Sequence, residues 1–293
     1  MSERDPKNRK PRWLLKRLPA GPEMLRIEGL LGSRHLHTVC QEALCPNMGE
    51  CFSAGTATFL ILGDRCTRNC RFCAVGKGNP LTPDPDEPER VAKTVQEMGL
   101  RFAVVTSVTR DDLPDGGAEH FARTVHAIRK HCPQIKVEVL VPDFCGDRQS
   151  LEVVASARPD VLNHNLETVP RLYPLARPGA DYRRSLDVLR VFKKLLPEFH
   201  TKSGLMLGLG ESPDEVRSVM KDLREALCDG LTLGQYLAPS RDHLPVQRYI
   251  PPEEFETFRR DAIQMGFVAV ASGPYVRSSY HAADMFPAPE GKA

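Results

Sequence analysis

The sequence of 293 residues has no long apolar run, no strong excess of charge of either sign and a single tryptophan. A membrane-spanning helix needs about 20 consecutive apolar residues, and no segment approaches that length. The 40 Lys and Arg residues face 38 Asp and Glu, and this net charge of +2 favours neither a nucleic-acid partner nor a membrane surface. No signal peptide is recognisable, so we expect a cytoplasmic protein.

Charge is uneven only at the start of the chain. The first twenty residues contain seven basic side chains: Arg4, Lys7, Arg9, Lys10, Arg12, Lys16 and Arg17. A solvated arm is the simplest interpretation, and contact with an anionic partner or an acidic carrier surface is the alternative. Acidic residues, prolines and scarce serine argue against a transit peptide.

Apolar residues make up 41% of the chain and recur as short continuous runs, which are typical of parallel strands buried on both faces. The expected strands are residues 58–62, 102–107, 136–141, 160–165, 204–209 and 231–237, with a seventh at 267–271. Helix-like segments lie between them at 89–98, 118–130, 148–157 and 182–196, after Ser212, and from about Pro252. The helix after Ser212 has the pattern of a capping box, because Glu215 stands three residues later.

About six repeats of strand and helix predict an α/β fold, specifically a partial (β/α)6 barrel of the TIM type with N- and C-terminal extensions. A doubly wound open sheet is the alternative. We expect an N-terminal extension over residues 1–56, the barrel over 57–265 and a C-terminal extension over 266–293. In either architecture the functional groups gather at the carboxyl ends of the strands.

Cysteine has the most informative distribution of any residue type. Six of the nine cysteines form two triplets, Cys40-x4-Cys45-x5-Cys51 and Cys66-x3-Cys70-x2-Cys73. An odd total with clustered spacing favours metal-binding loops over a disulfide framework. The strand-like segment TFLILG separates the triplets, so both are expected near one strand.

Three thiols in one short loop can hold an iron–sulfur cluster and leave one iron of a cubane without a protein ligand. Zinc is an alternative for the second triplet, since Cys70-x2-Cys73 is a common zinc spacing, although this loop offers no histidine as a fourth ligand. A redox disulfide suits three clustered thiols poorly. The first triplet is interpreted as an auxiliary cluster site, with simple burial of small apolar side chains as the alternative.

The segment CTRNCRFC, which follows a strand in a chain of repeated βα units, resembles the CxxxCxxC signature of the radical S-adenosylmethionine enzymes. This resemblance implies a [4Fe–4S] cluster on Cys66, Cys70 and Cys73. It also implies that the open iron binds the amine and carboxylate of S-adenosylmethionine, which is then cleaved to a 5′-deoxyadenosyl radical.

A wider set of motifs resembles the lipoyl synthase family. The motifs are CPNMGECFSAGTATFLILGDRCTRNCRFC, PRWLLKRLP, VLNHNLETVPRLY, RPGADY, TKSGLMLGLGE, LTLGQYLAPSRDHLPVQRY and SGPYVRSSYHA, and they span roughly residues 10 to 283. The resemblance implies radical insertion of two sulfur atoms at C6 and C8 of an octanoyl chain carried on a protein lysine. It implies a second [4Fe–4S] cluster on Cys40, Cys45 and Cys51 that gives up sulfide.

Further site residues follow from the same resemblance. In the RSSY motif we expect Ser279, rather than Ser278, to be the fourth ligand of the auxiliary cluster. In NHNLET, Asn165 and Glu167, with Asn163 beside them, are candidates for binding S-adenosylmethionine, and a hydrogen-bonded strand end is the other interpretation. His164 is expected to be an internal histidine with satisfied hydrogen bonds.

The implied partners are an octanoylated lipoyl carrier, either the E2 lipoyl domain of a 2-oxoacid dehydrogenase or the glycine cleavage H protein, and a flavodoxin- or ferredoxin-type reductant. The nearest alternative enzymes are radical methylthiotransferases and biotin synthase. From another class, a two-cluster electron carrier or a zinc-binding interaction module is the alternative.

Overall fold

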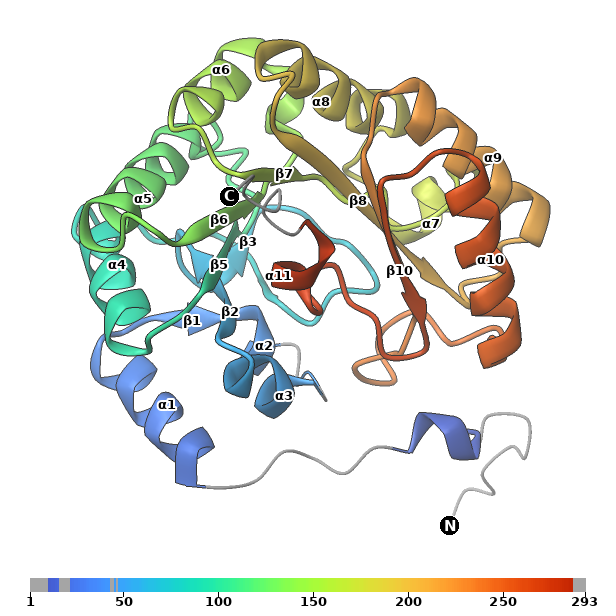
Figure 1. Cartoon of the computed structure of the whole chain (residues 1–293), viewed down its shortest axis with the longest axis horizontal. Coiled ribbons are helices and arrows are strands. Elements are labelled where there is room, and N and C mark those ends of the chain that lie inside the picture. The colour runs from blue at the N-terminus through green and yellow to red at the C-terminus, as the bar shows by residue number, and fades with distance from the viewer. Residues whose placement is uncertain (1–9, 16–21, 43–44, 46, 287–293) are drawn as a thin grey trace, which may run out of the picture.

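The centre of the fold is a curved sheet of eight strands inside a ring of helices (Figure 1). The computed structural model describes residues 10–15, 22–42, 45 and 47–286. The strands of the sheet are β1 (His37–Thr38), β2 (Thr56–Ile61), β5 (Phe102–Ser107), β6 (Lys136–Leu140), β7 (Val161–Asn163), β8 (His200–Leu207), β9 (Gly230–Gln235) and β10 (Ala269–Gly273). A separate two-stranded sheet pairs β3 (Arg65–Cys66) with β4 (Gly76–Lys77).

The order of strands in the sheet is β1-β2-β5-β6-β7-β8-β9-β10. Every pair from β2 to β10 is parallel, and only β1 runs antiparallel to β2. The order follows the chain without reversing, whereas a doubly wound sheet reverses at a switch point. The sheet is therefore a partial barrel, as the repeated βα pattern predicted, and β10 is the seventh strand expected after the last helix.

Helices cover the outer face of the sheet, with α11 lying inside the ring (Figure 1). The α-helices are α1 (Pro22–Ser33), α2 (Val39–Glu42), α3 (Met48–Ser53), α4 (Glu87–Glu97), α5 (Ala118–His131), α6 (Arg148–Ser156), α7 (Tyr173–Ala176), α8 (Tyr182–Leu195), α9 (Pro213–Glu225), α10 (Pro252–Gln264) and α11 (Ala282–Met285). Short 3-10 turns occur at η2 (Arg12–Leu14), η3 (Phe144–Gly146) and η4 (Pro170–Leu172). Within the described residues, no helix is both long and apolar enough to cross a membrane.

Helix α9 begins where the sequence predicted, directly after Ser212. The Ser212 side chain accepts a hydrogen bond from the backbone of Glu215, and the Glu215 carboxylate accepts one from the backbone of Ser212. This capping box satisfies two backbone donors that would otherwise lack partners at the first turn of α9. The helix buries the apolar stripe of Val216, Val219 and Met220 against the sheet.

The strand expected at 204–209 begins earlier, at His200. The three residues after His200, namely Thr201, Lys202 and Ser203, are polar yet completely buried. An apolar run cannot reveal them, because their burial depends on partners from other strands. The expected strand at 160–165 is shorter than predicted, since β7 ends at Asn163 and the chain then turns along the edge of the barrel.

The end of the described chain fills the opposite end of the barrel from the carboxyl edge. Phe286 packs with Phe102 and Val161 in a second apolar cluster at the first residues of their strands. The His200 ring stacks on Phe286 with centroids 4.2 Å apart, and Lys136 Nζ donates to the Phe286 carbonyl at 3.0 Å. The segment between β10 and Phe286 therefore runs from the carboxyl ends of the barrel strands to their amino ends.

Candidate active site

A cavity of about 640 Å³ lies at the carboxyl ends of the strands. All six cysteines of the two triplets line it, and so do Asn165, Glu167 and Ser279. The structure thus brings the two cysteine triplets together with Asn165, Glu167 and Ser279, from segments up to 239 residues apart (Cys40 to Ser279), whereas Asn163 does not line this cavity. In barrels of this type the carboxyl edge is where active sites form.

The loop that carries Cys66, Cys70 and Cys73 is closed at its base by the β3–β4 pair. The Cys66 sulfur accepts hydrogen bonds from the backbone N–H groups of Arg68 and Thr109, each at 3.4 Å. Amide donors of this kind stabilise a cluster-bound thiolate and tune its potential. Burial raises the pKa of Cys70, and it raises that of Cys73 to about 11, so metal binding at these thiols must release protons.

Arg68 ties this loop to two neighbouring strand ends. Its guanidinium binds Asp111 through two hydrogen bonds of 2.7 and 2.9 Å and donates to Asp143 at 2.6 Å. Arg184, from the first turn of α8, donates to the other oxygen of Asp143 at 2.8 Å. Burial acts to raise the pKa of Asp143, but the two arginines hold it at about 2. The ionised Asp143 carboxylate therefore stabilises the position of this loop through Arg68, and Arg184 in turn fixes the position of Asp143.

The first triplet lies on short helices next to β2. Cys40 is in α2, Cys51 is in α3, and the backbone N–H of Cys45 bonds the Cys40 carbonyl at 2.9 Å. Burial, with the nearby thiols of Cys45 and Cys51, raises the pKa of Cys40 to about 12. The three thiols are thus close enough to influence one another electrostatically.

The segment after β10 brings Ser278 and Ser279 into the same cavity. The Ser278 hydroxyl accepts a hydrogen bond from Asn165 Nδ2 at 3.1 Å. Within the described part of the chain, no hydrogen bond engages the Ser279 hydroxyl. The two serines therefore differ in their surroundings, with Ser278 directed to the NHNLET strand end.

Asn165 and Glu167 follow β7 at the cavity wall. Asn165 Nδ2 also donates to Glu167 Oε1 at 3.1 Å, and among the described residues Asn165 Oδ1 is buried without a partner. Glu167 has a left-handed backbone (φ 66°), and its N–H and carbonyl bond β8. Burial raises the pKa of Glu167 although Arg177 lies nearby. Strained and incompletely satisfied polar groups of this kind are typical of ligand sites.

His164 is satisfied at only one ring nitrogen. Its Nδ1 lies 2.8 Å from the Val141 carbonyl, which can only accept, so Nδ1 carries the proton. In the described structure its Nε2 is buried without a partner, and burial lowers the pKa of His164 to about 4, which keeps the ring neutral. Asn163 instead points to Glu138, to which it donates at 2.9 Å.

The residues present fit two iron–sulfur clusters and a polar ligand. The donor set is two groups of three thiols, one with amide donors on its sulfur, and unpaired buried polar atoms lie at the wall between strands. In the part of the chain that the structure describes, no three His, Cys, Asp or Glu side chains converge tightly enough to hold a single metal ion. All six thiols of the two triplets line one shared cavity.

Three arginines of the site were not found by sequence reasoning. Arg68 braces the loop, Arg177 lies near Cys70 and bonds the carbonyls of Asn165 and Leu166, and Arg277 lies near Cys45. Arginine is common on surfaces, so a single sequence offers no signal that separates these three from the others. The remaining cysteines, Cys132, Cys145 and Cys228, are outside the two triplets, and all nine cysteines are unbridged.

Comparisons with known proteins show the family to which this chain belongs. Residues 60–223 match the model of the Radical SAM superfamily. Lipoyl synthase of Acidithiobacillus ferrooxidans is 60% identical over 94% of this chain and 88% of its own length, and that of Desulfotalea psychrophila is 58% identical over 94% of this chain and 93% of its own.

Solved structures show the same fold at low identity. The crystal structure of methylornithine synthase superposes with a TM-score of 0.58 at 14% identity and covers 86% of this chain and 72% of that one. Streptococcus suis SuiB bound to its precursor peptide also scores 0.58, at 11% identity, over 83% of this chain and 50% of that one. With its cysteine triplets in one barrel cavity and its close relatives over nearly the whole length, this chain belongs to the lipoyl synthase family of the radical SAM superfamily.

Proposed function

We propose that this chain inserts two sulfur atoms at C6 and C8 of a protein-bound octanoyl-lysine chain, with Cys66, Cys70 and Cys73 holding one [4Fe–4S] cluster and Cys40, Cys45 and Cys51 holding the other. One observation carries the assignment of residues: both triplets line a single cavity. A carbon radical captures sulfur only if the sulfur source is close, because the encounter must be effectively intramolecular.

The substrate explains why the site needs such cofactors. C6 and C8 of a saturated chain have no neighbouring group that acidifies their hydrogens, so proton abstraction by a side chain cannot activate them. When bound, S-adenosylmethionine and the two clusters supply the radical that removes hydrogen and the sulfide that replaces it. The protein positions these groups and excludes water.

Different residues of the chain have different roles in this reaction. Arg68 fixes the loop of the second triplet against Asp111 and Asp143. Asn165 and Glu167 offer hydrogen-bonding groups for S-adenosylmethionine at the cavity wall. Ser279 is the fourth ligand of the auxiliary cluster, supported by its place on the cavity wall and by the engagement of its neighbour Ser278 with Asn165.

Three successive parts of the chain supply different components of the site. Residues 1–56 carry the auxiliary triplet, residues 57–265 form the radical-generating barrel, and residues 266–293 bring the RSSY motif. The strand Ala269–Gly273 of the last part pairs with β9, which anchors the extension on the barrel.

The protein partners are an octanoylated E2 lipoyl domain or glycine cleavage H protein, and a flavodoxin- or ferredoxin-type reductant. Most of the basic arm, including Arg4, Lys7, Arg9, Lys16 and Arg17, lies outside the described residues. Lys10 is described and lines the cavity. The Lys10 side chain at the cavity, in a segment of the sequence rich in Lys and Arg, suits an acidic carrier surface. A cytoplasmic location stays a prediction from the sequence.

An anaerobic assay with reconstituted protein, S-adenosylmethionine, a strong reductant and an octanoyl-lysine peptide tests this function. We expect 5′-deoxyadenosine, a dithiolated peptide and about eight irons per chain with matching sulfide. Zinc without sulfide would contradict the assignment, and two clusters without peptide thiolation would favour an electron carrier.

Replacing the cysteines of each triplet separates the two roles. Cys45→Ala is expected to abolish sulfur transfer while some cleavage of S-adenosylmethionine continues. Cys70→Ala is expected to abolish both. Thiolation that persists in Cys45→Ala would refute the donor role of the first triplet.

A further inference from the structure

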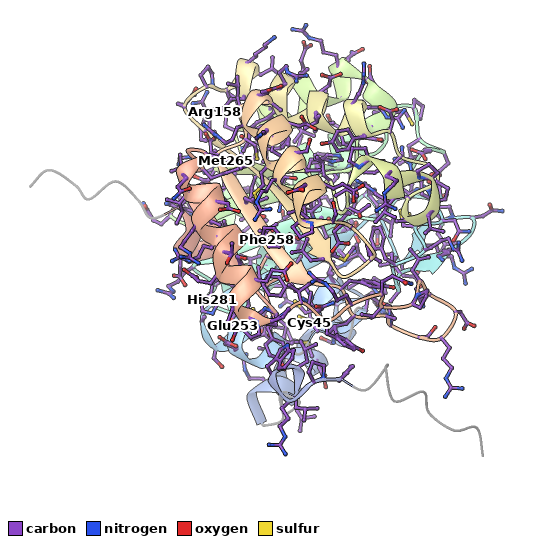
Figure 2. The ribbon with its side chains drawn as sticks, turned by 90° about the vertical axis from the view of Figure 1, so that its right-hand side faces the viewer. Cys45, Arg158, Glu253, Phe258, Met265 and His281 are labelled. Carbon is purple, nitrogen blue, oxygen red and sulfur yellow. The ribbon has the colours of Figure 1, made fainter. Side chains whose placement is uncertain are left out.

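The segment from Tyr275 to His281 lies against α3, the helix that carries Cys51. Figure 2 places His281 and Cys45 at the same end of the molecule. Residues 47–51 and 275–281 are more than 220 positions apart in the chain, yet three hydrogen bonds join them. The two segments therefore form one tertiary unit at the auxiliary triplet.

The first contact comes from Asn47, at the start of α3. Its side chain makes no capping bond to its own helix, although asparagine is a favoured capping residue. Asn47 Nδ2 instead donates to the Tyr275 carbonyl at 2.6 Å. The helix start is thus used to hold the chain that enters the RSSY motif.

The second contact comes from Glu50, one residue before Cys51. Its Oε1 accepts from the Tyr280 hydroxyl at 2.8 Å and lies 3.0 Å from His281 Nε2. His281 also binds Asp284 through Nδ1 at 2.8 Å and has a left-handed backbone (φ 50°). A non-glycine residue persists in that conformation when surrounding contacts compensate for it.

Ser278 and Ser279 lie between these two contacts. Because Tyr275 is held on one side and Tyr280 with His281 on the other, the short stretch between them has little freedom to swing away from α3. Helix α3 contains both Glu50 and Cys51, and its N-cap is Asn47, so this helix and the residue before it provide both contacts. These contacts therefore tie the serine segment to the helix that carries Cys51.

We propose that Glu50 is a positioning residue that holds the RSSY segment over the auxiliary cysteine triplet through Tyr280 and His281. The proposal rests on the function proposed above and deepens it. Outer hydrogen-bond partners of metal ligands typically change metal affinity by about 10- to 100-fold when removed. Glu50 acts through Tyr280 and His281 on the neighbouring serine.

The test uses the full chain, reconstituted anaerobically, with three variants. Glu50→Ala removes both bonds to the serine segment, and Tyr280→Phe removes one bond with little change of shape. Asp284→Ala is the matched control, because it removes the other partner of His281 and leaves α3 untouched. The readouts are the rate of iron loss to a chelator, the electron paramagnetic resonance of each reduced cluster, and 5′-deoxyadenosine formation.

We expect Glu50→Ala to lose iron from the auxiliary cluster about tenfold faster than wild type. The rate of iron loss from Tyr280→Phe should lie between the rates of wild type and Glu50→Ala. Asp284→Ala should lose iron at the rate of wild type. The spectrum of the second cluster and the formation of 5′-deoxyadenosine should stay unchanged in all three. Equal iron loss in Glu50→Ala and Asp284→Ala would overturn the proposal, and so would equal loss from both clusters. The proposed function fails separately, if wild type itself holds fewer than two clusters.

Discussion

Lys202 and Glu138 form an ion pair in the interior of the barrel, with 2.5 Å between Nζ and Oε2 and no exposed surface on either side chain. Lys202 lies on β8 and Glu138 on β6, and Asn163 on the intervening β7 donates to the other Glu138 oxygen at 2.9 Å. Three adjacent strands are thus joined by polar contacts inside the sheet. Such a group is stable only while every charge keeps its partner.

Replacing Lys202 by Met is expected to lower the free energy of unfolding by about 3–5 kcal/mol, because the buried Glu138 side chain would lose its cationic partner. The double variant Lys202→Met/Glu138→Leu should recover part of this loss. Recovery is incomplete because Asn163 loses its acceptor. Urea unfolding followed by circular dichroism measures both, and a single variant as stable as wild type would contradict the expectation.

The brace on the second cysteine loop predicts a graded effect of substitutions at Arg68. Arg68→Ala removes both bonds to Asp111 and the bond to Asp143, and displacement of the loop is expected to slow 5′-deoxyadenosine formation about 100-fold. Arg68→Lys keeps the charge but cannot bind both carboxylates with a planar fork, so its rate should be intermediate. Chromatography of 5′-deoxyadenosine in single-turnover reactions measures the rates. Equal rates in the two variants would show that geometry at Arg68 is unimportant.

Asp229 predicts a dependence of stability on pH. Burial acts to raise its pKa, but the His200 ring, with Nδ1 3.8 Å away, and hydrogen bonds from Lys193 and the Thr201 backbone lower it from 3.8 to about 2. A carboxylate with a lowered pKa stabilises the fold above the unfolded value and loses that contribution as the pH falls through the folded value. Its contribution, about 2 kcal/mol, is therefore present above pH 3.8 and disappears towards pH 2.

Unfolding of wild type and Asp229→Asn in matched cluster-free preparations, from pH 6 down to pH 2, tests this. Wild type should be more stable by about 2 kcal/mol at pH 6, and the gap should close as the pH falls. If the difference in unfolding free energy stayed constant from pH 6 to pH 2, the stabilisation would come from the packing of the side chain and not from its charge.

Gly234 predicts a packing effect on the serine segment. A Cβ on this β9 residue would lie 2.0 Å from the Val276 carbonyl oxygen, which is backbone and cannot turn aside. Gly234→Ala should therefore displace the segment and destabilise the protein by about 1–3 kcal/mol. Gly29→Ala is the control, since nothing lies within 4 Å of its added Cβ, and in helix α1 it should be neutral or slightly stabilising. Equal melting temperatures for the two variants would contradict the prediction.

Much of the barrel could be predicted from the chain because its signals are local. The helices predicted at 118–130 and 148–157 are found at Ala118–His131 and Arg148–Ser156, and the strand predicted at 102–107 is found at Phe102–Ser107. Continuous apolar runs, helical periodicity and the capping box at Ser212 each act within a few residues. Helix α1 was not predicted, and the start of β8 was predicted too late.

The cysteine spacing by itself determined that the chain has two three-thiol loops, since close neighbours in sequence cannot be far apart in space. Only the tertiary structure decided that both loops open into one cavity, that Lys202 pairs with Glu138, and that Glu50 reaches His281 across 231 positions. The physical reason is that these contacts depend on which strands and segments become neighbours. That is a property of the whole folded chain, which no short stretch of residues contains.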